Sequence, residues 1–260
     1  MIRVNLHCHT YRCHHAEGAD EEYIIRALEA GFTEIGFSDH IPFRPYADRE
    51  PSRYRVTPED TADYFAALRS LRERYRDRIT IRIGFESEYY PEHFESMLKT
   101  AEEAGAEYLL LGQHFLSNEL DGGLYSGTPT GDAQVLDRYC SLLAEGLSTG
   151  AFTYPAHPDL IGFTGDPAVY DRTVRKLIRK VMELGYPLEL NRLGFYEKRN
   201  YPDDRFWRIA GEEGARCVIG LDAHTPEVYT DTETVARIEE YLARFGLTPE
   251  TPAVRLLKKD

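Results

Sequence analysis

Seven of the nine histidines in this 260-residue chain stand in short segments that look like the ends of β-strands. These residues are His7, His9, His15, His40, His114, His157 and His224. Two carboxylates stand in similar settings, Glu86 in the segment RIGFESE and Asp222 in the segment VIGLDAH. Imidazoles and carboxylates hold zinc, iron and manganese in proteins, and these nine groups exceed what one ion needs. The sequence therefore predicts a hydrolase that binds two to three divalent transition metals (Zn, Fe or Mn).

Two of these positions have a neighbour that competes for the same role. His14 precedes His15, and because only one of two adjacent side chains normally points into a site, we favour His15 as the ligand. Glu88 would face the same side of a strand as Glu86, and we favour Glu86. Each neighbour remains an alternative ligand.

Other residues near the expected ligands have different expected roles. Asp39 precedes His40 and is expected to support or cap the site from behind rather than bind metal. His93 lies within an expected helix, away from any strand end, and is expected to be an ordinary residue. Cys8 and Cys13 flank the first histidines, so a thiolate ligand is conceivable, but small buried residues are the simpler interpretation.

The elements that must position these residues alternate between short β-rich runs and longer amphipathic stretches. The expected strands are 2–6, 34–38, 80–85, 108–111, 152–154, 187–190 and 217–221, with a weak eighth strand conceivable at 253–257. The expected helices are 20–30, 58–75, 91–104, 132–148, 167–184, 203–213 and 232–245. This alternation predicts an α/β fold with a parallel sheet that closes into a TIM-like (βα) barrel. No shift in composition marks a second domain, so we expect a single domain over residues 1–260.

The expected metal ligands follow the strands at one end. His7 and His9 come after the first strand with a spacing of two residues, which places both on one face. His40, Glu86, His114 and His157 end the next four strands, and Asp222 and His224 end the seventh. Active sites of parallel barrels lie at the carboxyl-terminal ends of the strands. The sequence thus predicts one metal site at that end.

Composition excludes several classes of function. The net charge of −13 argues against a broad nucleic-acid surface. There is no apolar run of the roughly 18 residues that a membrane helix needs, and the first residues do not look like a signal peptide. The four cysteines form no C-x-x-C pair, so a disulfide framework is not expected and a cytoplasmic location fits. The oligomeric state is not indicated.

Six short motifs carry a resemblance to a known family. They are HCHT at 7–10, SDH at 38–40, GFE at 84–86, GQH at 112–114, AHPD at 156–159 and GLDAH at 220–224. In this order they resemble the PHP (polymerase and histidinol phosphatase) superfamily of metal-dependent phosphoesterases. The resemblance implies a distorted seven-stranded (βα) barrel with up to three metals.

The resemblance also implies how the ligands divide among the ions. His7, His9, Glu86 and Asp222 would hold the first ion. Glu86 would bridge to a second ion, which His114 and His157 also hold. The third ion would be held by His15, His40 and His224.

Within the superfamily, one segment is similar to histidinol phosphatases and another departs from them. CHHAEG at 13–18 resembles the C-x-H-A-x-G segment of that subgroup. The subgroup tends to carry Asn-Thr-Ala/Ser-Gly after the sixth strand, whereas this chain has Asn-Arg-Leu-Gly at 191–194. This departure affects the identity of the substrate and leaves the expected metal ligands unchanged.

The expected reaction is hydrolysis of a small phosphorylated metabolite, L-histidinol phosphate, by a metal-held hydroxide. Divalent ions lower the pKa of bound water to about 7 and neutralise phosphoryl oxygens. Arg192, Lys198 and Arg199 are candidates to bind the phosphate, and Glu17 is a candidate for the substrate's ammonium group. No general acid is evident.

Three alternatives remain at this point. Another PHP phosphoesterase would act on other phosphomonoesters or on phosphodiesters. Amidohydrolases also carry H-x-H after the first strand and a late Asp, but they typically use a bridging lysine, and the third and fourth expected strands end without one. The third alternative is a metal-sensing or regulatory barrel without catalysis.

Overall fold

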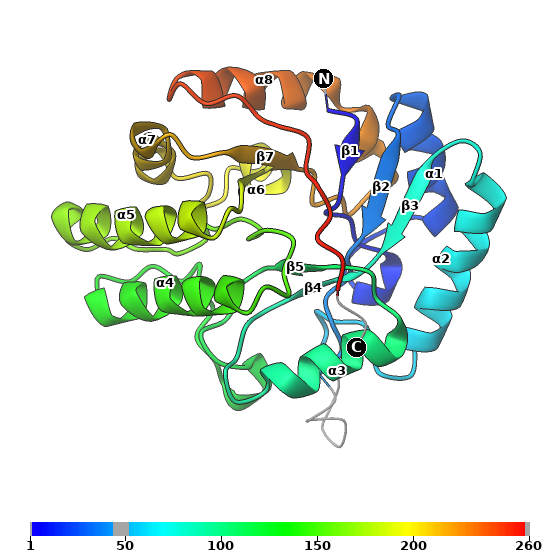
Figure 1. The fold of residues 1–260 in the computed structure, drawn as a ribbon, viewed down its shortest axis with the longest axis horizontal. Helices are drawn as coiled ribbons and strands as arrows, with labels where there is room; N and C mark the ends of the chain where they lie inside the picture. The colour runs from blue at the N-terminus through cyan, green and yellow to red at the C-terminus, as the bar shows by residue number, and fades with distance from the viewer. Residues whose placement is uncertain (1, 44–51, 258–260) are drawn as a thin grey trace.

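The computed structural model describes residues 2–43 and 52–257, and its elements alternate between strands and helices. The strands are β1 Val4–Asn5, β2 Glu34–Phe37, β3 Thr80–Ile83, β4 Phe85–Ser87, β5 Leu109–Leu111, β6 Leu188–Asn191 and β7 Cys217–Gly220. The α-helices are α1 Asp20–Glu29, α2 Thr61–Tyr75, α3 Phe94–Ala104, α4 Ala133–Ser148, α5 Pro167–Glu183, α6 Arg192–Glu197, α7 Asp204–Glu213 and α8 Thr232–Ala243. Short 3-10 helices are η1 Tyr11–Cys13, η3 Glu119–Asp121 and η4 Pro226–Thr230. The helices surround the strands (Figure 1).

All strand pairs are parallel, which confirms the predicted α/β class. The backbone ladders run in three groups, β1-β2-β3, β4-β5 and β6-β7. Isolated bridges extend this order: Cys8 pairs with Ala223, His40 with Glu86, and Leu111 with Pro155. In the described parts of the chain, no backbone bridge joins residues 152–157 to β6, so closure of a seven-stranded barrel stays a prediction.

The expected strand at 152–154 is wrong as a regular strand. Its backbone bonds to β5 through Thr153 N–H to Leu109 O at 2.7 Å and Leu111 N–H to Tyr154 O at 3.1 Å. Ala156 N–H donates to Leu111 O at 2.9 Å, which completes a single bridge between Leu111 and Pro155, and Pro155 has no N–H to offer a strand on its other side. The position of this segment beside β5 is nevertheless as expected.

The conceivable eighth strand at 253–257 is also irregular. Arg255 N–H donates to the Thr153 hydroxyl at 3.3 Å, and Leu257 N–H donates to Glu107 O at 2.9 Å. Glu250 N–H donates to Cys217 O at 2.8 Å. This C-terminal segment, 249–257, therefore binds three regions of the chain without joining a ladder (red in Figure 1).

Apolar side chains fill two layers. The larger layer lies between strands and helices and includes Leu109 and Leu111 of β5. Leu110 points the other way, into a smaller cluster on the opposite face of the strands. Of the described helices, none is long and apolar enough to cross a membrane. All four cysteines are free and buried.

Candidate metal centre

The strands bring most of the predicted ligands into one buried cluster. Histidines that follow the first, second, fourth and fifth expected strands approach within hydrogen-bond or ion-pair distance of Glu86, which ends the third. Its partners are His7 (3.3 Å), His9 (3.4 Å), His40 (3.3 Å), His114 (3.4 Å) and His157 (2.9 Å). Glu86 is therefore at the centre of the cluster.

Four ligand atoms have the spacing expected for one tetrahedral ion. The Nε2 atoms of His7 and His9 lie 3.3 and 3.4 Å from Glu86 Oε2, and 3.4 and 3.1 Å from Asp222 Oδ1. An ion bound at about 2.0–2.2 Å in tetrahedral geometry separates its ligand atoms by about 3.3–3.6 Å. The observed atoms fit such an ion.

Unpaired polar atoms support the same conclusion. Both ring nitrogens of His9, Glu86 Oε1 and Asp222 Oδ1 are buried, and although charged groups lie within 3.5 Å of them, none makes a well-aligned hydrogen bond among the described residues. Buried polar groups are nearly always satisfied, so atoms of this kind indicate a missing partner. A cation would satisfy the carboxylate oxygens and the imidazole lone pairs together.

The charge of the cluster also calls for cations. Four buried carboxylates, Glu86, Asp222, Asp39 and Glu189, have no Arg or Lys partner in the described chain. Together these four carboxylates carry a charge of −4, which two divalent cations would neutralise. Burial of such charges without compensation is costly.

The pKa directions agree with this demand for positive charge. Burial raises the pKa of the Glu86 carboxyl, but His114, His7 and His40 lower it well below its usual range. Burial lowers the pKa of His7, yet the carboxylates of Glu189, Asp222 and Glu86 raise it well above the usual value. Similarly, the pKa of His9 is raised to about 9, because Asp222 and Asp39 outweigh its burial.

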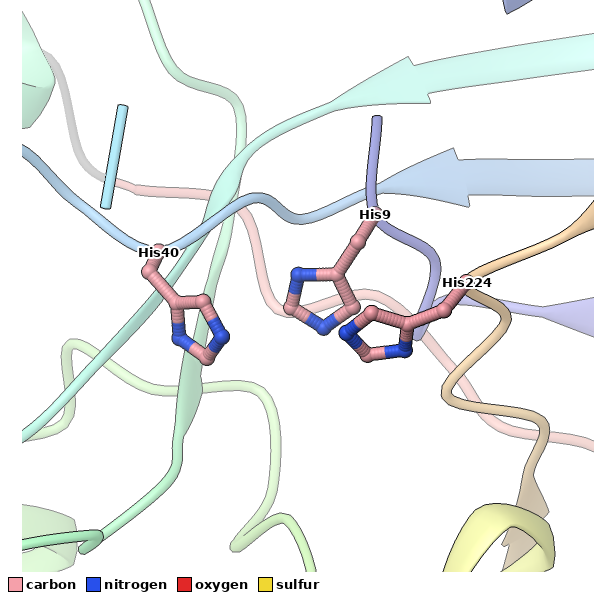
Figure 2. Close-up of side chains that lie close together, drawn as sticks. All are labelled: His9, His40 and His224. Carbon is pink, nitrogen blue, oxygen red and sulfur yellow. The ribbon is translucent and has the colours of Figure 1, made fainter. Parts of the chain in front are cut away.

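A second group of imidazoles lies next to this one. Figure 2 shows His9, His40 and His224 with their side chains directed into one space, and a ligand atom of each lies within 4.8 Å of the others. The rings of His9 and His224 are stacked 4.3 Å apart. His15 lies 5.5 Å from His40 and 4.8 Å from His224 between ring centroids. The region expected for a third ion thus contains His9 as well as the predicted trio.

The structure separates the competing neighbours. His14 is exposed and caps the end of η1, whereas His15 faces His224 and His40. Glu88 lies behind the cluster, 2.9 Å from Arg55 and 3.1 Å from His114 Nδ1. The geometry therefore brings His15 and Glu86 to the cluster.

Carboxylates and carbonyls fix the orientation of several imidazoles. The Nδ1 atoms of His7, His9 and His114 face Glu189 (2.8 Å), Asp39 (3.5 Å) and Glu88 (3.1 Å), respectively. His15 Nδ1 lies 2.7 Å from Cys13 O, and His224 Nδ1 lies 2.9 Å from Asp222 O. Partners of this kind hold the Nε2 atom toward a metal. The supporting position expected for Asp39 agrees with its contact to His9.

Glycine makes room for the central carboxylate. A Cβ atom on Gly112 would lie 1.8 Å from Glu86 Oε1, so no other residue fits at that position without displacing Glu86. Gly112 follows β5, immediately beside the carboxylate on β4. The GQH motif therefore combines a metal-type histidine with the space that its neighbour needs.

A cavity of about 870 Å³ opens above the cluster. His15, His40, Glu86, His114, His157, Asp222 and His224 contribute to its lining. Its walls also contain Tyr54, Phe115, Leu120, Tyr125, Leu193 and Tyr201. The site thus combines a charged floor with largely apolar and aromatic walls, which suits a small organic ligand.

Of the predicted phosphate-binding residues, only Arg199 lines this cavity. Its guanidinium bonds to Glu197 at 2.7 Å and to the Tyr201 hydroxyl at 3.2 Å. Arg192 pairs with Asp231 instead and stacks 4.2 Å over the ring of Tyr196.

Lys198 and Glu17 do not line the cavity either. Lys198 is exposed and ends α6. Glu17 is exposed, but its backbone N–H donates to His224 O at 2.8 Å. Its observed contribution is therefore to support the His224 loop.

Several residues of the site were missed from the sequence. Arg53 and Arg55 line the cavity, and Arg55 is bound on both sides by Glu88 and Glu119. Glu189 is fully buried within β6, next to His7. The signal for Glu189 was a charged residue inside an otherwise apolar expected strand.

Comparison with known proteins decides the family. The model of the PHP domain matches residues 5–193, most of the chain. This chain belongs to the PHP family. The family assignment confirms the resemblance carried by the six motifs.

PHP proteins similar to this one include proteins described as histidinol-phosphatases. A Deinococcus radiodurans protein described as "Probable histidinol-phosphatase" is 27% identical over 85% of each chain. A Schizosaccharomyces pombe protein with the same description is 24% identical, over 94% of this chain and 87% of its own. The fold also matches the crystal structure of histidinol phosphate phosphatase from Lactococcus lactis, complexed with zinc, L-histidinol and phosphate. That match has a TM-score of 0.72 and 15% identity, over 98% of this chain and 99% of the other.

Proposed function

We propose that this PHP protein is a metal-dependent phosphomonoesterase, a histidinol-phosphatase that converts L-histidinol phosphate to L-histidinol and phosphate in histidine biosynthesis. The observation that carries the proposal is the buried cluster of imidazoles and carboxylates on the floor of an open cavity. Support for the substrate comes from the two similar proteins described as histidinol-phosphatases. The CHHAEG segment adds to this support.

The proposed ligand set follows the geometry. His7, His9, Glu86 and Asp222 would hold one ion, and Glu86 with His114 and His157 a second. His15, His40 and His224, with His9 close by, would hold a third. When bound, such ions supply Lewis-acid polarisation of the phosphoryl oxygens and an acidified water.

The protein's own residues would bind and orient the substrate. Arg199 reaches the cavity and would donate charge-assisted hydrogen bonds to the phosphate. Arg53 also lines the cavity and has no ion-pair partner among residues 2–43 and 52–257. The carboxylate of Glu197, beside Arg199, would face the substrate's ammonium group more directly than Glu17.

The walls of the cavity suit the organic part of this substrate. Tyr54, which lies 6.0 Å from the His15 ring, and Tyr125 would contact the flat imidazole of histidinol phosphate. Apolar walls also exclude water from around the phosphoryl group, which strengthens electrostatic interactions there.

A comparison of substrates tests the proposal. We expect kcat/KM for histidinol phosphate at least about tenfold above that for p-nitrophenyl phosphate, which corresponds to about 1.4 kcal/mol of transition-state binding. The diester bis-p-nitrophenyl phosphate should be cleaved more slowly than either. Faster cleavage of the diester would overturn the assignment to histidinol phosphate.

A second candidate is a PHP phosphoesterase acting on other phosphomonoesters or on phosphodiesters. The departure at residues 191–194 favours it, because the threonine and the small residue of the subgroup are missing there. In the structure this stretch forms the start of α6, with Leu193 at the cavity wall. A panel of phosphomonoesters and diesters distinguishes the two candidates.

A further inference from the structure

We infer that Glu189 is a positioning residue that locks together two candidate ligands, His7 and His157, and that metal retention depends on its carboxylate. This inference rests on the proposed metal-dependent function. It assigns a role to a residue outside the predicted ligand set.

Glu189 uses both of its oxygens. Oε1 lies 2.8 Å from His7 Nδ1, and Oε2 accepts the backbone N–H of His157 at 2.8 Å. Oε2 also accepts from Asn191 Nδ2 at 3.1 Å, and the same amide lies 3.2 Å from Asp222 Oδ2. The buried side chain of Glu189 thus contacts His7 and His157 directly. It is linked to Asp222 through the amide of Asn191.

These contacts lie where the backbone ladder is interrupted. In the described chain, residues 152–157 have no bridge to β6, although they bond to β5 on their other side. The hydrogen bond from His157 N–H to Glu189 connects the two segments across this interruption. On the β6 side, the link between His157 and His7 is therefore made by a side chain rather than by strand pairing.

Only a carboxylate satisfies this arrangement. Three donors face Glu189: His7 Nδ1–H, His157 N–H and the Asn191 amide. A carboxylate offers two acceptor oxygens with about four lone-pair sites, whereas a glutamine offers one oxygen and an NH2 group. An amide at this position would place its NH2 against at least one donor.

The chain also leaves space for this carboxylate. A Cβ atom on Gly220, at the end of β7, would lie 1.7 Å from Glu189 Oε1. Gly220→Ala would therefore displace the carboxylate while keeping its charge. It offers a second variant with a different chemical change and the same expected consequence.

The test measures zinc retention rather than turnover. Wild-type protein, Glu189→Gln and Glu107→Gln are loaded with Zn²⁺, and zinc per folded chain is measured by elemental analysis against increasing chelator. Glu107 is a matched control, since it also accepts a backbone N–H (Ile83, 3.0 Å) but contacts no candidate ligand. We expect Glu189→Gln to weaken zinc binding about 10- to 100-fold, as loss of partners to ligand histidines does, and Glu107→Gln to match wild type.

Loading the protein with Co²⁺ gives a second readout, the visible spectrum. This spectrum would not change if Glu189 only stabilised the fold. The visible spectrum of the Co²⁺-loaded protein should change in Glu189→Gln and in Gly220→Ala, because the imidazole of His7 is reoriented. Wild-type zinc affinity and an unchanged cobalt spectrum in a folded Glu189→Gln overturn the inference, even if its unfolding midpoint is lower.

Two further outcomes are separable. If Glu189→Gln does not fold, the same measurements on Gly220→Ala decide, and unchanged zinc affinity there overturns the inference. If wild-type protein itself retains no metal, the proposed function fails first, and the failure is visible before any variant is compared.

Discussion

Two neighbouring clusters of side chains, one charged and one apolar, lie along the same strands. At the carboxyl-terminal ends lie the imidazoles and carboxylates around Glu86. Below them lies a small apolar cluster, made of Val4, Leu6, Tyr108, Leu110, Tyr154, Ala156 and Val218. Most members of both sets are buried, but the two sets differ in what their burial does to the free energy of folding.

Burial of the apolar cluster favours folding, at about 25 cal/mol per Å² of apolar surface. Burial of uncompensated carboxylates opposes folding. Ligands that bind only the folded state stabilise it. The comparison teaches that the charged end would need cations to offset the cost of its burial, whereas the apolar end stabilises the fold without them.

Glu86→Ala should produce the largest functional loss. Because Glu86 contacts five histidines, its removal should essentially abolish phosphatase activity. The loss should exceed the factor of about 10–100 that follows when a residue hydrogen-bonded to a metal ligand is removed. Bound zinc, measured by elemental analysis, should fall as well. His93→Ala is the control, since His93 precedes α3 and packs beside Phe43, and the activity of this variant should stay within about twofold of wild type. Equal losses in both variants would contradict the comparison.

Leu110→Ala should produce the complementary result at the apolar end. Leu110 is fully buried, so its truncation should lower the free energy of unfolding by about 2–5 kcal/mol, measured by urea titration. Zinc per folded chain should remain at the wild-type level. Leu124→Ala, at a position 40% exposed, should change stability by less than about 0.5 kcal/mol. Loss of zinc with Leu110→Ala would show that the two ends are not separable.

Arg199→Ala should have an intermediate effect confined to substrate binding. Loss of a charge-assisted hydrogen bond to phosphate costs about 1.5–3 kcal/mol, so kcat/KM should fall about 10- to 100-fold. Zinc content and unfolding should be unchanged, because Arg199 contacts none of the candidate ligands. Arg179→Ala, on the outer face of α5, removes an equivalent guanidinium and should leave kcat/KM unaltered. A similar loss in both would indicate a general charge effect.

Val254→Ala should have the smallest effect. Val254 packs, partly buried, against the apolar cluster from the C-terminal segment. We expect a loss of about 0.5–1.5 kcal/mol in the free energy of unfolding, comparable with removal of small buried groups. Activity per folded chain should be unchanged. A drop in activity without a drop in stability would link this segment to the charged end.

The convergence of the candidate ligands was predictable because residue type and strand register are both visible in a sequence. His7 and His9 lie two residues apart after an apolar run, and parallel strands bring such residues to one end. The longer helices followed from their apolar periodicity and caps: Asp166, for example, accepts the N–H of Ala168 at 2.7 Å at the start of α5. The short helix α6 was not expected.

What could not be predicted depends on tertiary placement. Glu189 and Arg55 take part in the site only because distant segments face them. Arg192 was expected near the phosphate, but the short helix α6, capped by Asn191, turns it toward Asp231. The composition of residues 152–154 favours a strand. In the folded chain this segment ends at a proline and forms only an isolated bridge. Barrel closure and the single domain over 1–260 remain predictions.

The C-terminal segment also has a consequence for the order of folding. Its partners, at Glu107, Thr153 and Cys217, all precede it in the chain. A ribosome adds about 5–20 residues per second from the N-terminus onward, so residues 249–257 emerge after everything they cover. Until then, one side of the apolar cluster lacks its cover. We therefore expect released chains that end before residue 249 to be more sensitive to protease than chains that include residues 249–257.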